Sequence, residues 1–245
     1  MHLVLTGATG LVGSAVLQTM LTTPSISKIS ILSRRPVAQA EGHAKAMVII
    51  HKDFAEYGDE VLDGLKDVKG VVWALGISAS QVGKEEYERI TLTYPLSFAR
   101  ALSKTTPPSP LTFIYISGEG ATPTPSFLTQ HWARTKGLAE SSLLSLSKDP
   151  AYSNLRPLSV RPGGVDMKEH TEIHQWVGSR NWAEALALPV LRVLPGVQGL
   201  MSPTRELGKV LVELAMGGGE ALEGKGVSGE GRTLGNAAVR RLAGI

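Results

Sequence analysis

The sequence predicts an α/β protein with a doubly wound, mostly parallel sheet, helices on both faces and one insertion in its second half. Two observations predict this class. Strand-like and helix-like segments alternate along the chain, and a glycine-rich turn joins the first strand to the first helix. With 245 residues, 42% of them hydrophobic, the chain is long enough for one such domain over residues 1–245 and short for two.

The glycine-rich turn has the spacing of a phosphate-binding loop. It follows the apolar residues 3–5 and precedes an amphipathic run. In Gly7-x-x-Gly10-x-x-Gly13, the first glycine allows a sharp turn, the second lets the backbone approach a phosphate, and the third lets helix and strand pack closely. The alternative, glycines that serve only the turn, is disfavoured by the strand and helix on either side. The motif predicts a Rossmann dinucleotide site, with contacts from Gly7, Thr9, Gly10, Leu11, Val12 and Gly13.

The second strand, 29–32, ends in residues that favour NADP over NAD. In NAD-binding proteins of this kind, an Asp or Glu at this point binds the ribose hydroxyls. This chain has Ser33, Arg34 and Arg35 there instead. Because guanidinium groups pair with a 2′-phosphate that a carboxylate would repel, we expect these three residues to bind NADP(H). The alternative is a pair of solvated surface arginines.

Residues after the third and fourth strands extend the predicted cofactor site. The third strand is 46–50, and Asp53 and Phe54 follow it, where an acid can bind the adenine amino group and a ring can cover the base. Asp53 as a helix N-cap is an equal alternative. The fourth strand, 71–76, ends in small residues that let a cofactor pass close to the backbone. The contacts expected there come from Ala74, Leu75 and Gly76.

The fifth strand places a hydroxyl at the edge of the site. A helix over 84–103 precedes this strand, and its Tyr87 and Tyr94 are expected to pack rather than to react. The strand, 111–116, leads directly into Ser117. Because ligands bind beyond the carboxyl ends of such strands, Ser117 is expected at the edge of the site.

A helix over 128–146 and a sixth strand over 155–161 continue the alternation. Pro162 and Gly163 follow the sixth strand as further expected cofactor contacts. The tail is glycine-rich over 217–235 and ends in a short helix that we expect Asn236 to cap.

The insertion, 164–203, interrupts the alternation and is expected to form a lid over the substrate side of the cofactor. Its aromatic and apolar residues would line the lid, and its histidines are further candidate proton donors. The residues concerned are His170, His174, Trp176, Trp182 and the stretch 185–194. The His-x-x-x-His spacing lacks a third ligand, so we predict no metal site.

Composition excludes several classes. The net charge is +3 and the pI about 9.1, but the basic residues are scattered and only 5% of residues are aromatic, so we expect no nucleic-acid partner. The chain has no cysteine, which excludes disulfides and thiolate catalysis. No apolar run is long enough to span a bilayer, and the first strand leaves no room for a signal peptide. We expect a cytoplasmic protein, with peripheral attachment to an organelle membrane as the alternative; the sequence does not indicate the oligomeric state.

Five features together resemble the atypical short-chain dehydrogenase/reductase superfamily. They are the Gly7-x-x-Gly10-x-x-Gly13 turn, Ser33-Arg34-Arg35, Ser117, the helical motif Arg134-x-Lys136-Gly137-x-x-Glu140 and Val160-Arg161-Pro162-Gly163. Within it, the chain is most similar to the nucleoside-diphosphate-sugar-epimerase-like branch, which holds the Tat-interacting tumour-suppressor proteins and their fungal mitochondrial relatives. The resemblance implies an NADP-binding Rossmann protein and leaves the substrate open.

The resemblance also implies catalytic residues, and here the chain departs from it. Catalytic members use a Ser with a Tyr-x-x-x-Lys pair: the lysine binds the nicotinamide ribose and lowers the pKa of the tyrosine, which exchanges the proton. Ser117 and Lys136 match, but Trp132 stands where the tyrosine should be. An indole has no usable protonation equilibrium. His131 has a suitable pKa, but the neighbouring helical position points about 100° away, so a surface histidine is the favoured alternative.

Two functions remain. The first is an NADPH-dependent oxidoreductase that acts on a small carbonyl compound with a non-standard proton donor. The second is a non-catalytic NADP(H)-binding protein with a regulatory or interaction role. The hydroxyl of Ser117 favours the enzyme slightly, because a protein without turnover has little need of it.

Overall fold

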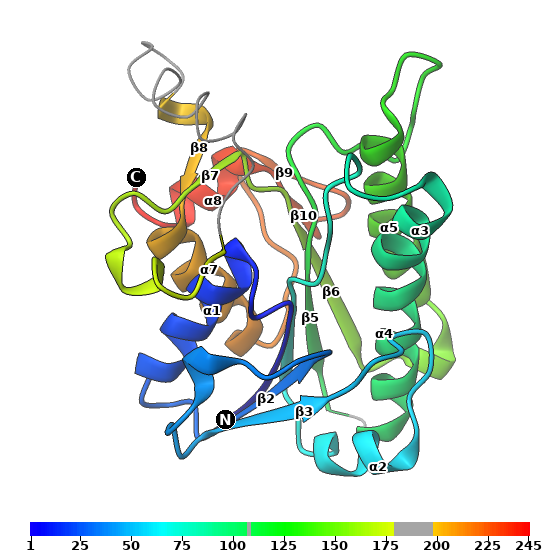
Figure 1. The fold of residues 1–245 in the computed structure, drawn as a ribbon. Helices are drawn as coiled ribbons and strands as arrows, with labels where there is room; N and C mark the ends of the chain where they lie inside the picture. The colour runs from blue at the N-terminus through cyan, green and yellow to red at the C-terminus, as the bar shows by residue number, and fades with distance from the viewer. Residues whose placement is uncertain (107–108, 179–197) are drawn as a thin grey trace.

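The computed structural model describes residues 1–106, 109–178 and 198–245. Its central sheet has eight strands: β1 (His2–Thr6), β2 (Lys28–Ser33), β3 (Ala46–Ile50), β4 (Gly70–Trp73), β5 (Leu111–Ile116), β6 (Leu155–Val160), β9 (Val227–Ser228) and β10 (Thr233–Leu234). The strand order is β3-β2-β1-β4-β5-β6-β10-β9, and every pair is parallel except β10 with β9. This arrangement confirms the predicted doubly wound, mostly parallel class (Figure 1).

Helices cover both faces of the sheet (Figure 1). One face carries α1 (Leu11–Thr22), α7 (Thr204–Met216) and α8 (Asn236–Leu242), and the other carries α2 (Asp59–Leu62), α3 (Lys84–Glu88), α4 (Tyr94–Thr105) and α5 (His131–Leu146). Central strands of such sheets are buried on both sides, which explains why Leu3, Val4 and Leu5 are all apolar and fully buried.

Each face of the sheet has its own hydrophobic core. The core under α1 and α7 is aliphatic, with Val16, Leu17 and Leu211 among its members. The core under α4 and α5 contains a group of packed rings: Phe54, Trp73, Phe98 and Phe113. The aromatic core fixes the position of α4 and α5 against β4 and β5, and this determines where their side chains meet the sheet edge.

The helix predicted over 84–103 is present as an unbroken helical run, but it changes its hydrogen-bond pattern in the middle. A π-helical turn, Arg89–Thr93, joins α3 to α4. Pro95 has no N–H to donate to the carbonyl of Thr91, four residues earlier. That carbonyl accepts a hydrogen bond from the Tyr115 hydroxyl at 3.0 Å instead. Because Pro95 leaves this carbonyl free, Tyr115 of β5 can form a hydrogen bond with the π-helical turn.

Other boundaries also differ from prediction. The helix expected from 128 begins at His131, because the Ser126 N–H donates to the Thr129 Oγ1 in a preceding turn. The fourth strand ends at Trp73, and the glycine-rich tail contributes β9 and β10.

Asn236 does not cap the last helix. Gly235 occupies the N-cap, and Asn236 is the first helical residue. Its side-chain amide donates to the Gly199 carbonyl at 3.0 Å and its Oδ1 accepts from the Ser202 hydroxyl at 2.6 Å. Asn236 therefore attaches α8 to the end of the insertion.

The two ends of the insertion pair with each other. β7 (Gly164–Asp166) and β8 (Met201–Pro203) form a separate two-stranded parallel sheet. Trp176 is half-buried. Trp182 and the stretch 185–194, which we expected to line a lid, lie outside the described residues.

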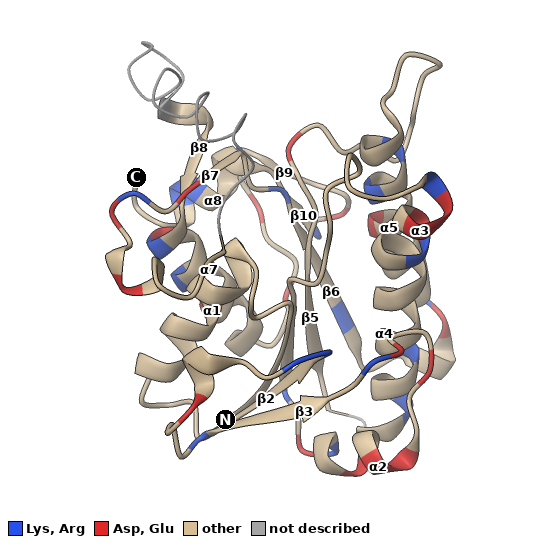
Figure 2. Ribbon diagram, in the orientation of Figure 1, with Lys and Arg blue, Asp and Glu red and all other residues tan. Residues whose placement is uncertain are grey.

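Charges of both signs are interspersed over both helical layers (Figure 2). Within residues 1–106, 109–178 and 198–245, no helix combines the length and apolar character needed to cross a bilayer. The same residues contain no group of three or more acidic or histidine side chains placed to hold a metal ion.

Candidate functional site

A groove of about 810 Å³ runs along the carboxyl ends of the central strands, where ligands bind in such sheets. Five segments form it: the loop after β1, the end of β2, the segment after β4, the end of β5 and helix α5. The predicted contacts that line it are Gly7, Thr9, Gly10, Leu11, Val12, Arg34, Arg35, Ala74, Leu75, Gly76 and Lys136. These residues are far apart in sequence, and the fold brings them together.

Two glycines of the loop are required by close packing. Gly7 has φ +69°, and a Cβ there would lie 2.3 Å from the carbonyl oxygen of Ala74. A Cβ on Gly13 would lie 2.0 Å from the Gly7 carbonyl oxygen. Gly10 is the N-cap of α1, with no side chain capping the helix among the described residues. The N–H groups at the start of α1 are thus directed to the groove, as a phosphate ligand requires.

The end of β2 forms an adjoining cavity of about 450 Å³, lined in part by Ser33, Arg34, Arg35 and Phe54. The Arg35 guanidinium reaches across to the glycine-rich loop and donates to the Thr9 Oγ1 at 3.4 Å. The Arg35 N–H donates to the Ser33 Oγ at 3.3 Å. In the described lining of the groove and this cavity, the charged side chains are Arg34, Arg35 and Lys136, all cationic. The site therefore suits an anionic ligand.

Asp53 and Phe54 have different positions. Asp53 is exposed, and its Oδ1 accepts from the Ala55 N–H at 2.9 Å; it belongs to neither described lining. It caps no helix, because the next one, α2, has Gly58 at its N-cap. Phe54 is only 1% exposed and packs edge-on to Trp73, with ring centroids 6.0 Å apart. The expectation for Asp53 as an N-cap is therefore wrong, and Phe54 serves the core as well as the cavity.

Lys136 is the cation at the other end of the groove. Its Nζ donates to the carbonyl oxygens of Ser117 at 2.8 Å and Ile116 at 3.3 Å, at the end of β5. Burial lowers the pKa of Lys136 to about 8, and the nearby carboxylate of Glu140 acts in the opposite direction. Lys136 is the described lining residue whose pKa lies closest to neutral pH.

Glu140 lies one helical turn beyond Lys136 and is buried. The Arg161 Nε donates to its Oε1 at 2.8 Å and the Arg161 Nη2 to its Oε2 at 2.5 Å. This two-pronged ion pair joins α5 to the end of β6 and fixes the orientation of the helix face that carries Lys136.

Ser117 lies beside the groove rather than in its described lining. It is 3% exposed, and its N–H donates to the Val160 carbonyl at 2.8 Å. Its Oγ is buried and has no hydrogen-bond partner among the described residues. A buried hydroxyl without a partner is uncommon, and a ligand oxygen would satisfy it.

Trp132 and His131 do not belong to the described lining of the groove. The Trp132 ring packs against the loop after β5: a Cβ on Gly120 would lie 3.3 Å from its Cη2. Its Nε1 donates to the Gln130 Oε1 at 2.6 Å. His131 packs on the Tyr87 ring of α3, with centroids 5.7 Å apart. His131 therefore packs between α5 and α3, and a catalytic role for it stays a prediction.

Pro162 and Gly163 are not in the described lining of the groove. The Gly163 N–H donates to the Ser202 Oγ at 3.0 Å, and a Cβ there would lie 1.9 Å from the Leu200 carbonyl oxygen. Gly163 therefore allows the end of the insertion to approach, and Val165 lines the groove in place of both residues.

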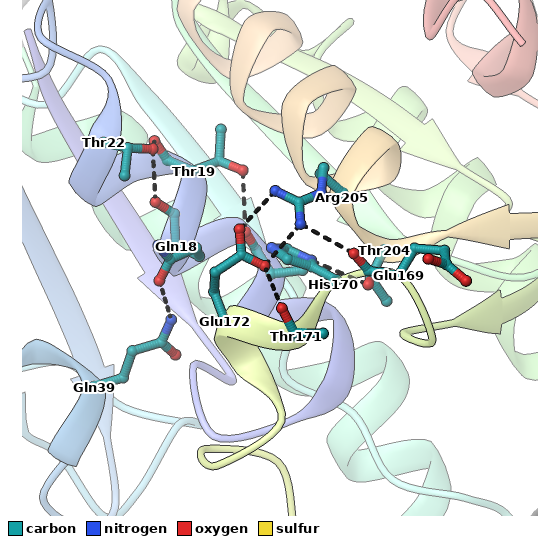
Figure 3. A network of polar contacts seen from close by, with 11 residues as sticks. Gln18, Thr19, Thr22, Gln39, Glu169, His170, Thr171, Glu172, Thr204 and Arg205 are labelled. Atoms are coloured by element: carbon teal, nitrogen blue, oxygen red, sulfur yellow. Dashed lines mark hydrogen bonds and ion pairs between the residues drawn. The ribbon is translucent and has the colours of Figure 1, made fainter.

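His170 lies on the α7 side of the molecule, beside Thr204 (Figure 3). His170 is buried, its Nδ1 lies 3.1 Å from the Thr204 Oγ1, and burial lowers its pKa. Beside it, the Arg205 Nη1 is 2.7 Å from Glu172 Oε1. The His174 Nε2 bonds the Met167 carbonyl at 2.8 Å. Neither histidine belongs to the described lining of the groove, so the structure does not bring these candidate proton donors together with Lys136.

Sequence reasoning missed several lining residues. They are Ile77, Ser78, Gln81, Thr91, Tyr115, Ile116, Val165, Val177 and Gly178. Most belong to loops, and their only sequence signal is their place after a strand or within the insertion.

Comparison with known proteins identifies relatives of this chain. No family model matches it. Leucinostatins biosynthesis cluster protein T of Purpureocillium lilacinum is 33% identical over 98% of this chain and 94% of that protein. Botcinic acid biosynthesis cluster B protein 16 of Botryotinia fuckeliana is 36% identical over 54% of this chain and 86% of that protein. FMP52, a mitochondrial protein of Candida albicans, is 25% identical over 91% of this chain and 88% of that protein.

Solved structures share the fold. A short-chain dehydrogenase family protein from Francisella tularensis has a TM-score of 0.65 at 15% identity and covers 96% of both chains. The reductase domain of PhqB from Penicillium fellutanum has a TM-score of 0.65 at 16% identity, over 96% of this chain and 66% of that one. WbmF of Bordetella bronchiseptica, solved with NAD⁺, has a TM-score of 0.66 at 14% identity, over 99% and 76%. The first of these relatives shows that this chain belongs to the family of leucinostatins biosynthesis cluster protein T, and the solved structures show that it has the fold of short-chain dehydrogenase family proteins.

Proposed function

We propose that this protein is an NADPH-dependent oxidoreductase that reduces a small carbonyl compound. The observation that carries the proposal is the charge arrangement of the groove: Arg34 and Arg35 lie at one end, Lys136 at the other, and no acidic side chain belongs to the described lining. The glycine-rich loop lies between them. A dinucleotide with phosphates at its adenosine end and a nicotinamide near Lys136 fits this arrangement.

The arginines support NADPH rather than NADH. The guanidinium groups of Arg34 and Arg35 are exposed at the end of β2, next to the Ser33 hydroxyl. A 2′-phosphate there would gain charge-assisted hydrogen bonds, whereas the ribose hydroxyls of NADH would meet no carboxylate in the described lining.

The residues at the Lys136 end of the groove have separate roles in this proposal. The nicotinamide end of the cofactor would lie next to Lys136, and the unpartnered Ser117 Oγ would bind the substrate oxygen after a small side-chain rotation. The cofactor, when bound, supplies a hydride to the substrate carbon. Trp132 cannot supply the accompanying proton.

The names of two relatives support a substrate class. Leucinostatins biosynthesis cluster protein T and botcinic acid biosynthesis cluster B protein 16 are named for small-molecule biosynthesis clusters. Apolar side chains contribute to the described lining of the groove, among them Ile77, Ile116, Val165 and Val177. We therefore propose a hydrophobic carbonyl-bearing intermediate of small-molecule biosynthesis as substrate.

A substrate panel tests the proposal. Purified protein is mixed with NADPH and with aldehydes, ketones and quinones of increasing apolar area, and NADPH oxidation is followed by absorbance. We expect turnover with at least one apolar carbonyl and much slower turnover with NADH. Cofactor binding without turnover across the panel would contradict the enzymatic proposal.

One observation favours a second function, a non-catalytic NADP(H)-binding protein with a regulatory or interaction role. The tyrosine position holds Trp132, which packs on the loop after β5. In this function, cofactor binding would order the residues around the groove and change contact with a partner. Binding without turnover in the substrate panel would support it.

The location of the protein is a separate proposal. The cytoplasm remains the prediction from sequence, and the word mitochondrial in the name of FMP52 supports the alternative, attachment to an organelle membrane surface. Fractionation of cells that express the full chain distinguishes the two, with salt extraction to release a peripheral protein.

A further inference from the structure

We propose that Lys136 itself donates the proton to the substrate oxygen and is thus the catalytic acid of this protein. The inference rests on the proposed reductase function and deepens it. It assigns to the lysine a step that the resemblance assigns to a tyrosine, and it explains how a reductase can work with Trp132 at that position.

The described lining offers few other groups that could donate. The Tyr115 hydroxyl gives its proton to the Thr91 carbonyl, and burial raises its pKa well above the usual range. Arg34 and Arg35 stay protonated at any working pH. The described lining contains no Asp, Glu or His. Among the described lining residues, Lys136 is therefore the group that can both give and regain a proton near neutral pH.

The geometry leaves a proton for a ligand. A lysine ammonium has three N–H bonds. Two of them point to the carbonyl oxygens of Ser117 and Ile116, which fix Nζ at the end of β5. The third has no acceptor among the described residues, and Lys136 lines the groove. The residue whose carbonyl holds Lys136, Ser117, also has a buried Oγ without a hydrogen-bond partner among the described residues, which a substrate oxygen could satisfy.

The surroundings set the strength of this acid. Burial lowers the pKa of Lys136 to about 8, so its proton is released far more readily than that of an exposed lysine. Glu140 on the same helix opposes this effect, and Arg161 on the end of β6 neutralises Glu140. Tyr115 on β5 remains neutral. A donor with a pKa near the working pH is effective because it is protonated before the step and a good acid during it.

The reduction adds one hydride and one proton to the substrate carbonyl. The substrate carbon gains a hydride, with its electron pair, from the reduced nicotinamide, and the π electrons of the carbonyl move to oxygen. The N–H bond of the Lys136 ammonium breaks as the O–H bond of the product alcohol forms. Lys136 remains as a neutral amine, which regains a proton from solvent.

Three measurements on the full chain test this role. The first is the pKa of Lys136, followed by NMR of ¹³Cε-labelled lysine in wild type and assigned with Lys136→Arg. The second is NADPH affinity, by fluorescence titration. The third is the rate of carbonyl reduction from about pH 6 to about pH 10, which covers roughly two units on either side of the Lys136 pKa. Lys136→Arg keeps the charge and hydrogen bonds but holds its proton too tightly to donate. Lys209→Arg, at an exposed position of α7, is the matched control.

We expect a Lys136 pKa near 8 and a reduction rate that falls above that pH, because only the ammonium form can donate. Lys136→Arg should bind NADPH within about threefold of wild type yet lose at least about 100-fold in rate, the usual contribution of a general acid. Lys209→Arg should match wild type in both.

The outcomes separate this inference from the proposed function. A Lys136 pKa above 10, or an arginine variant that retains the wild-type rate, would overturn the role of Lys136 and leave the reductase proposal standing. NADPH binding without turnover of any carbonyl by wild type would overturn the reductase proposal and this role with it.

Discussion

Arg161 binds Glu140 through two hydrogen bonds, one helical turn beyond Lys136 on α5. The side chain of Glu140 is 4% exposed and that of Arg161 18%, so water screens the pair little. The pair therefore has two effects: it joins the helix to the sheet, and it sets the electrostatic potential at the Lys136 ammonium.

Glu140→Gln tests both effects. Breaking a buried ion pair leaves the Arg161 charge without its partner and should cost about 3 kcal/mol, the lower end of the usual range. For a chain of this size that is a loss of roughly 6–12 °C in Tm. Because Glu140 raises the Lys136 pKa, its loss should move the alkaline fall in reduction rate to lower pH. Calorimetry and a pH–rate profile measure these, with the exposed Glu223→Gln as control. An unchanged pH profile would show that Glu140 has no influence on the proton donor.

The Arg34→Ala, Arg35→Ala double variant tests the choice of cofactor. Each charged contact to a 2′-phosphate is worth about 1.5–3 kcal/mol, so NADPH affinity should fall at least about tenfold while NADH affinity changes little. Titration calorimetry with both cofactors measures this. Arg100→Ala, at an exposed position of α4, is the control and should bind both as wild type does. Equal affinity of the wild type for NADPH and NADH would refute the preference.

Trp132→Tyr should restore a phenol four residues before Lys136. A phenol with an ordinary pKa of about 10 keeps its proton where the lysine has lost it. The variant should therefore reduce small carbonyls at least about tenfold faster than wild type at high pH, with a smaller gain at neutral pH. NADPH oxidation from neutral to alkaline pH measures the gain. No gain at any pH, in a folded variant that binds NADPH, would mean that position 132 does not reach the substrate oxygen.

Gly137→Ala should destabilise the protein although alanine favours helices. A Cβ on Gly137 would lie 1.9 Å from the carbonyl oxygen of Thr122, so α5 would have to move away from that loop. The gain of about 1 kcal/mol in helix propensity should be outweighed by an overpacking cost of about 1–3 kcal/mol. Denaturant unfolding measures the difference. Gly64→Ala, where a Cβ meets nothing within 4 Å, is the control; a Gly137→Ala variant more stable than wild type would contradict the close packing.

Much of the fold could be predicted because its signals are local. β3 and β5 match the predicted segments 46–50 and 111–116, since a run of apolar residues between turns has few other uses in a chain of this class. The π-helical turn at Arg89–Thr93 could not be predicted, because it depends on Pro95 and on the reach of Tyr115 from another element. β9 and β10 have two residues each, too few for a periodic pattern.

The site residues could be predicted where a sequence motif determines the backbone. They could not be predicted where tertiary packing determines the direction of a side chain. The glycine-rich loop, Arg34 and Lys136 line the groove because strand ends meet at one edge of the sheet. Asp53 and Gly163 also follow strands. The Asp53 side chain accepts a hydrogen bond from the Ala55 N–H in its own turn, and Gly163 leaves room for the Leu200 backbone. His170 is directed by Thr204, 34 residues later in the chain. Such contacts depend on tertiary structure that a single sequence does not reveal.

The proline at the start of α4 ties the wall of the groove to its floor. Pro95 has no N–H to donate, and the Thr91 carbonyl accepts from the Tyr115 hydroxyl instead. Thr91 and Tyr115 both line the groove, so one hydrogen bond holds the helical wall against β5. A change at Tyr115 should therefore be felt at Thr91, on the opposite side of that bond, while the phosphate-binding loop stays in place.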